Sequence, residues 1–420
     1  MIRTIALDHG TDPALAGLRP YQHHALEAIA SCGTIAAGLH VEICDHCGDR
    51  RMVPNTCGHR SCPHCQARER AKWVEARTAE MLPCNYFQVV FTLPPKLRSL
   101  SMAFPAVVLD VLMRASSDAI DQQARSQRFL GAEVGQLAIL HTWTRDLRYH
   151  PHVHVMTTAG GIGGDPDNPR WVDARRYGKD SRPFLVPVDV LRDAFRRFLR
   201  KGLLRAYDNG ELPWEADSNT DAGADAAADA QQRFAAFLDL ALDCPIVIRI
   251  EPPFGSPELL LKYLGAYVNR AAVSPGRVTY DRPSGMVTLH WKANAAPDVA
   301  RETTMSATEF LLLFAQHILP PGFHRIRFRG LWCTAHRATK LDLARRLLGL
   351  QGGMAISAAG TASPPLQPPE GDLCTRCGLG HYQRLPGLVQ RPRSRERRRL
   401  LAEIRGQGPH PTHGGNPTAA

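Results

Sequence analysis

The sequence predicts an α+β fold with three parts: a small cysteine-rich domain, a larger domain with a central antiparallel sheet flanked by helices, and a partly disordered basic tail. Five cysteines fall within positions 44–65. From residue 82, short strand patterns alternate with longer amphipathic helix patterns. After residue 350 the chain becomes rich in Gly, Ala, Ser and Pro. We therefore expect domains at 1–80, 81–340 and 341–420.

Composition and charge narrow the class of protein. The 420 residues, 44% of them hydrophobic, suffice for a sizeable core in two or three domains. No stretch of about 18 apolar residues occurs and the start lacks a long apolar run, so we expect a cytoplasmic protein with no membrane partner. The net charge of +11 suits a polyanionic partner such as nucleic acid, although a basic protein with a merely solvated surface fits equally well.

Periodicity and turn residues assign the elements in order. The expected helices are 20–30, 66–81, 104–126, 188–207, 257–270, 306–318 and 341–350. The expected strands, rich in β-branched and aromatic residues, are 87–93, 136–143, 152–158, 246–250, 278–280 and 287–291. Residues 209–229, rich in Ala, Asp and Gly, are expected to form a flexible insertion. The arginine run at 391–399 is typical of a solvated tail, and sometimes of a phosphate-binding one.

Two CxxC motifs predict a zinc-ribbon-like site in the first domain. Cys44-x-x-Cys47 and Cys62-x-x-Cys65 each place two thiols on one turn, and disulfides are disfavoured in a cytosolic chain. Zinc prefers four thiolate or imidazole ligands, and such a closed site is structural rather than catalytic. Cys57 is a further expected ligand. The spare candidates, one of which could replace a motif cysteine or join a second ion, are Cys32, His40 and His59.

A third CxxC motif, Cys374-x-x-Cys377, stands alone near the end of the chain. It would need two more ligands to hold zinc. Cys333, His336 or His381 are candidates, and nothing in their spacing chooses among them. We therefore expect no second zinc ribbon.

A His-x-His pair is the candidate metal site for catalysis. His152 and His154 are two residues apart on a predicted strand, so both point to one face. If the hairpin turns around 146–147, His141 lies opposite His152 and becomes a third ligand. Three imidazoles favour zinc, manganese or nickel, and magnesium stays open because phosphate and water add oxygen ligands. Taken alone, most such pairs are surface or core histidines.

A tyrosine pair is the candidate nucleophile. Tyr263 and Tyr267 are four residues apart on a predicted helix, hence on one face, where an isolated pair is usually packing. A phenol with a pKa near 10 needs help to attack phosphorus, and a divalent ion on the phosphate supplies it. The product would be a covalent phosphotyrosine bond that conserves the energy of the broken phosphodiester. Rejoining would need no nucleotide, and the sequence has no GxxxxGK[ST] loop.

The sequence resembles transposases of the insertion sequence 91 family, which are two-tyrosine members of the HUH endonuclease superfamily. The resemblance covers about 21–330. It rests on these motifs, in this order: Cys44-x-x-Cys47, Cys62-Pro63-His64-Cys65-Gln66, Val89-Val90-Phe91-Thr92-Leu93-Pro94, Leu140-His141-Thr142-Trp143, His150-Pro151-His152-Val153-His154-Val155, Tyr263-Leu264-x-x-Tyr267-Val268-x-Arg270-x-Ala272-Val273-Ser274 and Gly322-Phe323-His324-Arg325-Ile326-Arg327.

The resemblance implies rolling-circle-like transposition by a bacterial, nucleoid-associated enzyme. The first domain would be a zinc-binding DNA-recognition domain and the second the HUH catalytic domain. Zinc would be structural, and Mg²⁺ or Mn²⁺ would serve catalysis. Family members often have arginine where Ala266 stands and histidine where Gln88 stands, so Gln88 is a second candidate for the third ligand. The residues expected to contact DNA are Arg68, Arg70, Lys72, Lys262, Arg270, Arg325 and Arg327.

Three other functions fit parts of the sequence. A plasmid rolling-circle replication initiator or relaxase would use the same chemistry. A zinc-finger DNA-binding protein without catalysis would form no covalent adduct with DNA. A metal-dependent hydrolase would use His152 and His154 with water and would not need the tyrosines. The oligomeric state is open.

Overall fold

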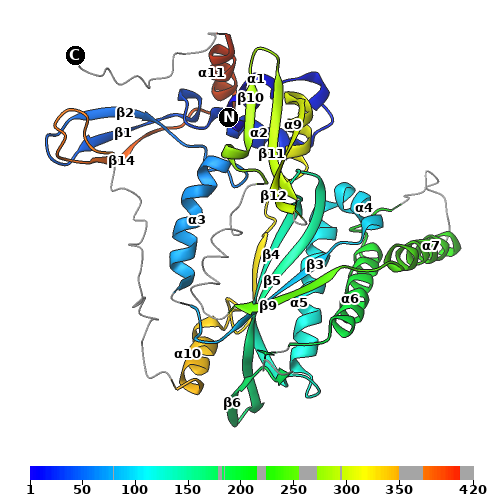
Figure 1. The fold of residues 1–420 in the computed structure, drawn as a ribbon. Coiled ribbons are helices and arrows are strands. Elements are labelled where there is room, and N and C mark those ends of the chain that lie inside the picture. Colours follow the sequence, from blue (N-terminus) through cyan, green and yellow to red (C-terminus); the bar gives the residue numbers. More distant parts are fainter. Residues whose placement is uncertain are drawn as a thin grey trace. The chain divides into compact units, whose positions relative to one another are not determined.

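The computed structural model describes residues 1–78, 80–177, 182–183, 185–214, 224–254, 272–293, 296–349 and 372–406 (Figure 1). The chain divides into two units, each assembled from segments that are distant in sequence. Unit 1 comprises Met1–Glu69, Val273–Ile318 and Gly360–Ala420, and unit 2 comprises Arg70–Ala272 and Leu319–Ala359. This division differs from the boundaries expected after residues 80 and 340, because helices and strands from the middle and the end of the chain pack with N-terminal elements.

Unit 1 contains two three-stranded antiparallel sheets, in the orders β14-β1-β2 and β10-β11-β12. The N-terminal helices pack with a helix from the middle of the chain: the Nε2 of Gln22 donates to the carbonyl oxygen of Ala315 at 2.7 Å. The described elements of this unit are α1 (Ile2–His9), η1 (Pro13–Leu15), α2 (Pro20–Ser31), η2 (Ile35–Ala37), β1 (Leu39–Cys44), β2 (Arg50–Pro54), the first turns of α3 (Pro63–Thr78), η4 (Pro275–Arg277), β10 (Val278–Asp281), β11 (Met286–Ala293), β12 (Ala296–Ser306), α9 (Ala307–Ala315), β14 (Tyr382–Gln390) and α11 (Ser394–Gly406).

The C-terminal segment is folded over 372–406, so the expectation of a partly disordered tail was wrong there. β14 lies antiparallel to β1, with Tyr382 opposite Cys44. The arginine run lies in α11, where Leu401 is buried and the Nε of Arg405 donates to the carbonyl oxygen of Leu7 at 2.6 Å. The segment is ordered by partners from the N-terminal region, which its own composition cannot reveal.

Unit 2 is built on an antiparallel six-stranded sheet of order β13-β4-β5-β3-β9, with β6 extending β5. β4 and β5 form its long central hairpin, whose turn has Leu147 at a φ of 66°. The described elements are η3 (Pro95–Leu97), α4 (Arg98–Ala103), α5 (Pro105–Arg125), α6 (Val188–Asp208), α7 (Ala224–Leu242), α10 (Arg337–Leu347), β3 (Tyr86–Thr92), β4 (Ala132–Trp143), β5 (Tyr149–Asp165), β6 (Asn168–Asp173), β7 (Arg176–Tyr177), β8 (Arg182–Pro183), β9 (Ile248–Phe254) and β13 (Ile326–Gly330).

The two faces of this sheet bury different side chains. α5 and α6 cover one face, where Phe91, Val153 and Phe195 belong to the main core (Figure 1). The other face carries a smaller core that includes Met156 and Trp332. Because alternate residues of a strand point to opposite faces, Val153 enters the main core while its neighbours on β5 face the other side. The histidines of β5 therefore lie on the face that the helices α5 and α6 leave open.

One expectation about local structure is wrong in part, and another concerns residues outside the description. The expected insertion at 209–229 ends in a helix, because α7 begins at Ala224 in a run of alanine, the best helix former. The expected helix at 257–270, with Tyr263 and Tyr267, lies outside the described residues. Within the described part of the chain, no helix is both long enough and apolar enough to span a membrane.

Candidate active site and metal centres

The hairpin β4–β5 brings three histidines together. His141 on β4 is the cross-strand partner of His152 on β5, the register that the sequence predicted. His154 follows two residues on and points to the same face. The three side chains each offer a ring nitrogen, and these nitrogens lie within 4.8 Å of one another. Three imidazole nitrogens at this spacing suit a divalent transition-metal ion.

The tautomer of His152 is fixed by the backbone. Its Nδ1 lies 2.7 Å from the carbonyl oxygen of His150, which can only accept, so Nδ1 carries the proton. The lone pair of the neutral ring then resides on Nε2. An Nδ1–H bonded to a backbone carbonyl is a usual partner arrangement for a histidine that binds metal through Nε2.

Gln88 on β3 contacts His154 rather than standing apart from the site. Its amide nitrogen lies 2.9 Å from Nδ1 of His154, and both residues are buried. A half-turn of the amide exchanges its donor for its acceptor, so Gln88 can hold the Nδ1–H tautomer of His154. That tautomer leaves Nε2 for a metal. The geometry thus gives Gln88 an orienting contact, and it leaves His141 as the third imidazole.

Burial keeps the imidazoles of His152 and His154 neutral. It lowers the pKa of His152 to about 4, and the pKa of His154 to about 3, where the nearby His152 adds to the effect. Neutral rings at physiological pH are what metal binding requires. The site fits a metal by donor type, spacing and protonation state.

Two neighbours of the histidines were not singled out in the sequence. Trp143 stacks on the ring of His141 with centroids 4.7 Å apart. The Nη2 of Arg98, from α4, lies 3.0 Å from Nδ1 of His150. Only tertiary structure brings Arg98 to this strand end, so no spacing rule would have found it. It adds a positive charge beside the site.

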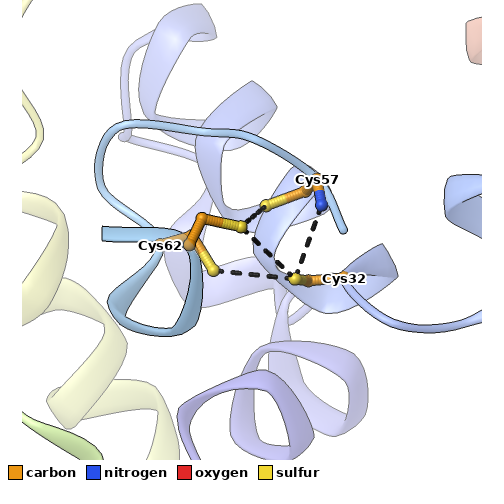
Figure 2. A group of neighbouring side chains, drawn as sticks. Cys32, Cys57 and Cys62 are labelled. Carbon is orange, nitrogen blue, oxygen red and sulfur yellow. Dashed lines mark hydrogen bonds between the residues drawn. The ribbon is translucent and has the colours of Figure 1, made fainter. Parts of the chain in front are cut away.

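The first cysteine cluster consists of Cys32, Cys57, Cys62 and Cys65. The sulfur of Cys32 lies 3.8 Å from that of Cys62 (Figure 2). It lies 3.7 Å from the sulfur of Cys65. Cys57 and Cys65 are also separated by 3.7 Å. With a Zn–S bond of about 2.3 Å, the sulfurs of a zinc tetrahedron stand about 3.8 Å apart. Cys32, at the end of α2, thus completes a set to which the sequence assigned it only as a spare candidate.

A second cluster, Cys44, Cys47, Cys374 and Cys377, overturns the expected pairing of the two N-terminal CxxC motifs. Cys44 and Cys47 lie with the C-terminal motif and not with Cys62 and Cys65. The remaining candidate ligands lie outside both clusters. His40 contacts Asn55 and Glu42, and the Nδ1 of His59 accepts from the backbone N–H of Ser61. The other three candidates, which belong to neither cluster, are Cys333, His336 and His381.

The structure describes only some of the residues that were expected to contact DNA. Arg327 pairs with Asp110 of α5 at 2.7 Å, on the helix-covered face of the sheet, and its contact with DNA stays a prediction. Arg325 is half-buried just before β13. Lys262 and Arg270, like the tyrosine pair, lie outside the described residues. α3 includes Arg68, Arg70 and Lys72, but their side chains also lie outside the description.

Comparison with known proteins identifies families and relatives that this chain resembles. A family model described as a transposase zinc-binding domain matches residues 6–93, and one described as a putative transposase matches 135–340. The putative transposase y4qJ of Sinorhizobium fredii is 39% identical over 329 residues, which is 78% of this chain and 79% of the relative. The transposase for insertion sequence element IS801 of Pseudomonas savastanoi pv. phaseolicola is 32% identical over 148 residues, 35% of each chain. No solved structure matches significantly.

Cysteine clusters of zinc geometry in one unit and a histidine-bearing antiparallel sheet in the other define a metal-binding protein with a structural zinc module. Within that class, this chain belongs to the transposases of the insertion sequence 91 type, with an N-terminal zinc-binding transposase domain. It is accordingly an enzyme that acts on DNA. The resemblance inferred from the sequence motifs is confirmed at the level of the family.

Proposed function

We propose that this transposase cleaves and rejoins single-stranded DNA through a phosphotyrosine intermediate, in an HUH-type domain that supports rolling-circle-like transposition. The observation that carries the proposal is the cluster of His141, His152 and His154 on the face of the central sheet opposite α5 and α6. A closed structural zinc site would use a fourth protein ligand, whereas three imidazoles leave positions for a phosphate oxygen and water.

The described residues would have three roles: binding the metal, orienting a metal ligand and attracting the phosphate. His141, His152 and His154 would hold a divalent ion, Mg²⁺ or Mn²⁺, and Gln88 would orient His154 through its contact with Nδ1. When bound, the ion supplies Lewis-acid polarisation of the scissile phosphate. Arg98 adds positive charge at the same strand end, where a phosphate would approach.

The nucleophile is one of two tyrosines, Tyr263 or Tyr267. Its phenol gives up a proton as the oxygen bonds to phosphorus, and the leaving oxygen of the strand takes up a proton. One strand end then stays bonded to the protein, and attack by a free hydroxyl reverses the step without a nucleotide cofactor. A second tyrosine would allow a second strand to be cut while the first is held.

A denaturing gel tests this proposal. Labelled single-stranded DNA from the ends of the element, incubated with the full chain and Mn²⁺ or Mg²⁺, should yield a protein–DNA adduct. Tyr263→Phe with Tyr267→Phe should abolish it, as should His152→Ala with His154→Ala. Tyr207→Phe is a matched control, because Tyr207 stacks on Phe234 inside unit 2. This variant should keep full activity.

The outcomes separate the rival functions. If the double phenylalanine variant still cuts the strand, water is the nucleophile and the protein is a hydrolase. If the wild-type chain binds its DNA but never forms an adduct, the protein is a non-catalytic DNA-binding protein. A replication initiator or relaxase would form the same adduct but with plasmid origin DNA rather than with the ends of the element.

A further inference from the structure

We propose that Cys44, Cys47, Cys374 and Cys377 bind a second structural zinc ion, and that this ion fastens the C-terminal segment to the N-terminal zinc-binding domain. The family models that match the chain cover 6–93 and 135–340. Half of this ligand set, Cys374 and Cys377, therefore lies beyond both models. The proposal is independent of the chemistry proposed for the histidines and tyrosines.

The sulfur positions have the spacing of a zinc tetrahedron. The sulfurs of Cys44 and Cys377 are 3.8 Å apart, and those of Cys47 and Cys374 are 3.7 Å apart. All four lie within 4.8 Å of one another. A disulfide requires about 2.05 Å, and all four cysteines are free thiols. Four soft sulfur donors in this arrangement favour zinc over the hard cations calcium and magnesium.

The two halves of the site share one local shape. Each CxxC motif is followed by a glycine in the left-handed region, Gly48 with φ 73° and Gly378 with φ 64°. The N–H of Gly48 donates to the carbonyl oxygen of Cys44 at 3.1 Å, and the N–H of Gly378 donates to that of Cys374 at 2.9 Å. Each half also has a backbone N–H that donates to a ligand sulfur, from Cys47 to Cys44 at 3.4 Å and from Gly380 to Cys377 at 3.5 Å. Backbone donors of this kind stabilise thiolates.

The halves also fit closely against each other. A Cβ at Gly380 would stand 2.6 Å from the sulfur of Cys44 and 2.5 Å from Cβ of His46, so a side chain is excluded there. The carboxylate of Asp45 accepts from the backbone N–H of His381 at 2.8 Å. Two matching turns held face to face form a built site, and chance proximity of four thiols would not produce the repeated turn geometry.

The β14-β1-β2 sheet has a small core, and an ion would stabilise it. Among the described residues, the buried cluster at β1, β2 and β14 consists of Cys44, Cys374 and Tyr382, with Cys377 against it. Such a core is too small to stabilise a three-stranded sheet, and small folds of this kind use metal ions instead. Polar contacts then set the alignment, as when the Tyr382 hydroxyl donates to Asp49 at 2.6 Å.

Zinc counting on the full-length chain tests the proposal. Cys374→Ser with Cys377→Ser should bind one zinc ion fewer than the parent chain, measured by mass spectrometry of metals on purified protein. Cys244→Ser with Cys333→Ser is the matched control and should lose none, because neither residue belongs to a cluster. An unchanged zinc count in the first variant overturns the proposal, and so does iron in place of zinc.

A second measurement on the unmodified chain serves if the variant does not fold. Cys47 is exposed, so as a free thiol it would react readily with iodoacetamide. We expect its alkylation in the zinc-loaded chain to be at least tenfold slower than after treatment with a chelator, as peptide mass spectrometry would show. Equal rates before and after chelation would mean that Cys47 holds no metal. Neither result depends on DNA cleavage, so failure here leaves the proposed transposase chemistry untouched.

Discussion

At the scale of single residues, the candidate active site depends on strand alternation and on hydrogen bonds that fix each imidazole. Val153 enters the apolar core under α5 and α6, and this anchors β5 so that His152 and His154 face the other side. The carbonyl oxygen of His150 then fixes the tautomer of His152, and the amide of Gln88 contacts Nδ1 of His154. The histidine pattern was visible in the sequence, whereas these contacts were not.

Gln88→Ala tests the orienting role of Gln88. Loss of a partner behind a metal-binding histidine typically costs about 10–100-fold in metal affinity or activity. We expect the Mn²⁺ concentration for half-maximal adduct formation to rise by about tenfold or more, with saturating Mn²⁺ restoring the adduct. Gln122→Ala, at an exposed position of α5, is the control and should change nothing. Unaltered metal dependence in Gln88→Ala would remove Gln88 from the site.

Arg327→Ala separates a structural role from a DNA contact. Arg327 pairs with Asp110 at 2.7 Å and lies over the ring of Phe323, with little of its side chain exposed. We expect a loss of about 1 kcal/mol in unfolding free energy, measured by urea denaturation. Affinity for single-stranded DNA, measured by fluorescence anisotropy, should stay within about twofold. A tenfold loss of affinity at unchanged stability would restore the DNA contact that the sequence suggested.

At the scale of elements, strands and helices followed from local periodicity, and the connections between distant elements did not. The helices α2 and α6 were predicted nearly as they stand, because their apolar residues recur with the period of the element. The hairpin β4–β5 was predicted in the correct register but with shorter strands. β14 and α11 were missed as ordered elements because their stability comes from β1 and the N-terminal helices. The repeated CxxC-Gly sequence at Gly48 and Gly378 was the one signal that could have paired Cys44 with Cys374.

Gly380→Ala tests the fit between the two turns of the second cysteine cluster. The added methyl would collide with the sulfur of Cys44 and with Cβ of His46. We expect the variant to bind one zinc ion fewer than the parent chain and to show a lower thermal midpoint. Gly276→Ala, where nothing lies within 4 Å of the new Cβ, is the control in the same unit. Full zinc content in Gly380→Ala would show that the turns do not meet around an ion.

At the scale of the whole molecule, the chain combines a zinc-binding domain with a unit built on a histidine-bearing antiparallel sheet. The net charge of +11 predicted a polyanionic partner, and the transposase family makes that partner DNA. Charge could not say which residues bind it. Arg327 illustrates this, because its positive charge pairs with Asp110 inside the protein.

Salt dependence tests the DNA-binding role of α3. Each phosphate neutralised on a single strand contributes about −0.7 to the slope of log affinity against log salt concentration. Replacing Arg68, Arg70 and Lys72 with Ala should therefore reduce the steepness by about 2, measured by anisotropy from low to moderate salt. Arg327→Ala serves as the charge-matched comparison for one lost cation and should leave the slope unchanged. An unaltered slope in the triple variant would place the phosphate contacts elsewhere.

The most direct test of the central claim is the identity of the atom that holds the DNA. The adduct formed with single-stranded DNA should be digested with nuclease and protease, and the nucleotide-bearing peptide sequenced by tandem mass spectrometry. The proposed chemistry predicts a nucleotide linked through phosphate to the phenolic oxygen of Tyr263 or Tyr267. Cleaved DNA whose new phosphate carries oxygen from labelled water, with no modified tyrosine, would contradict it.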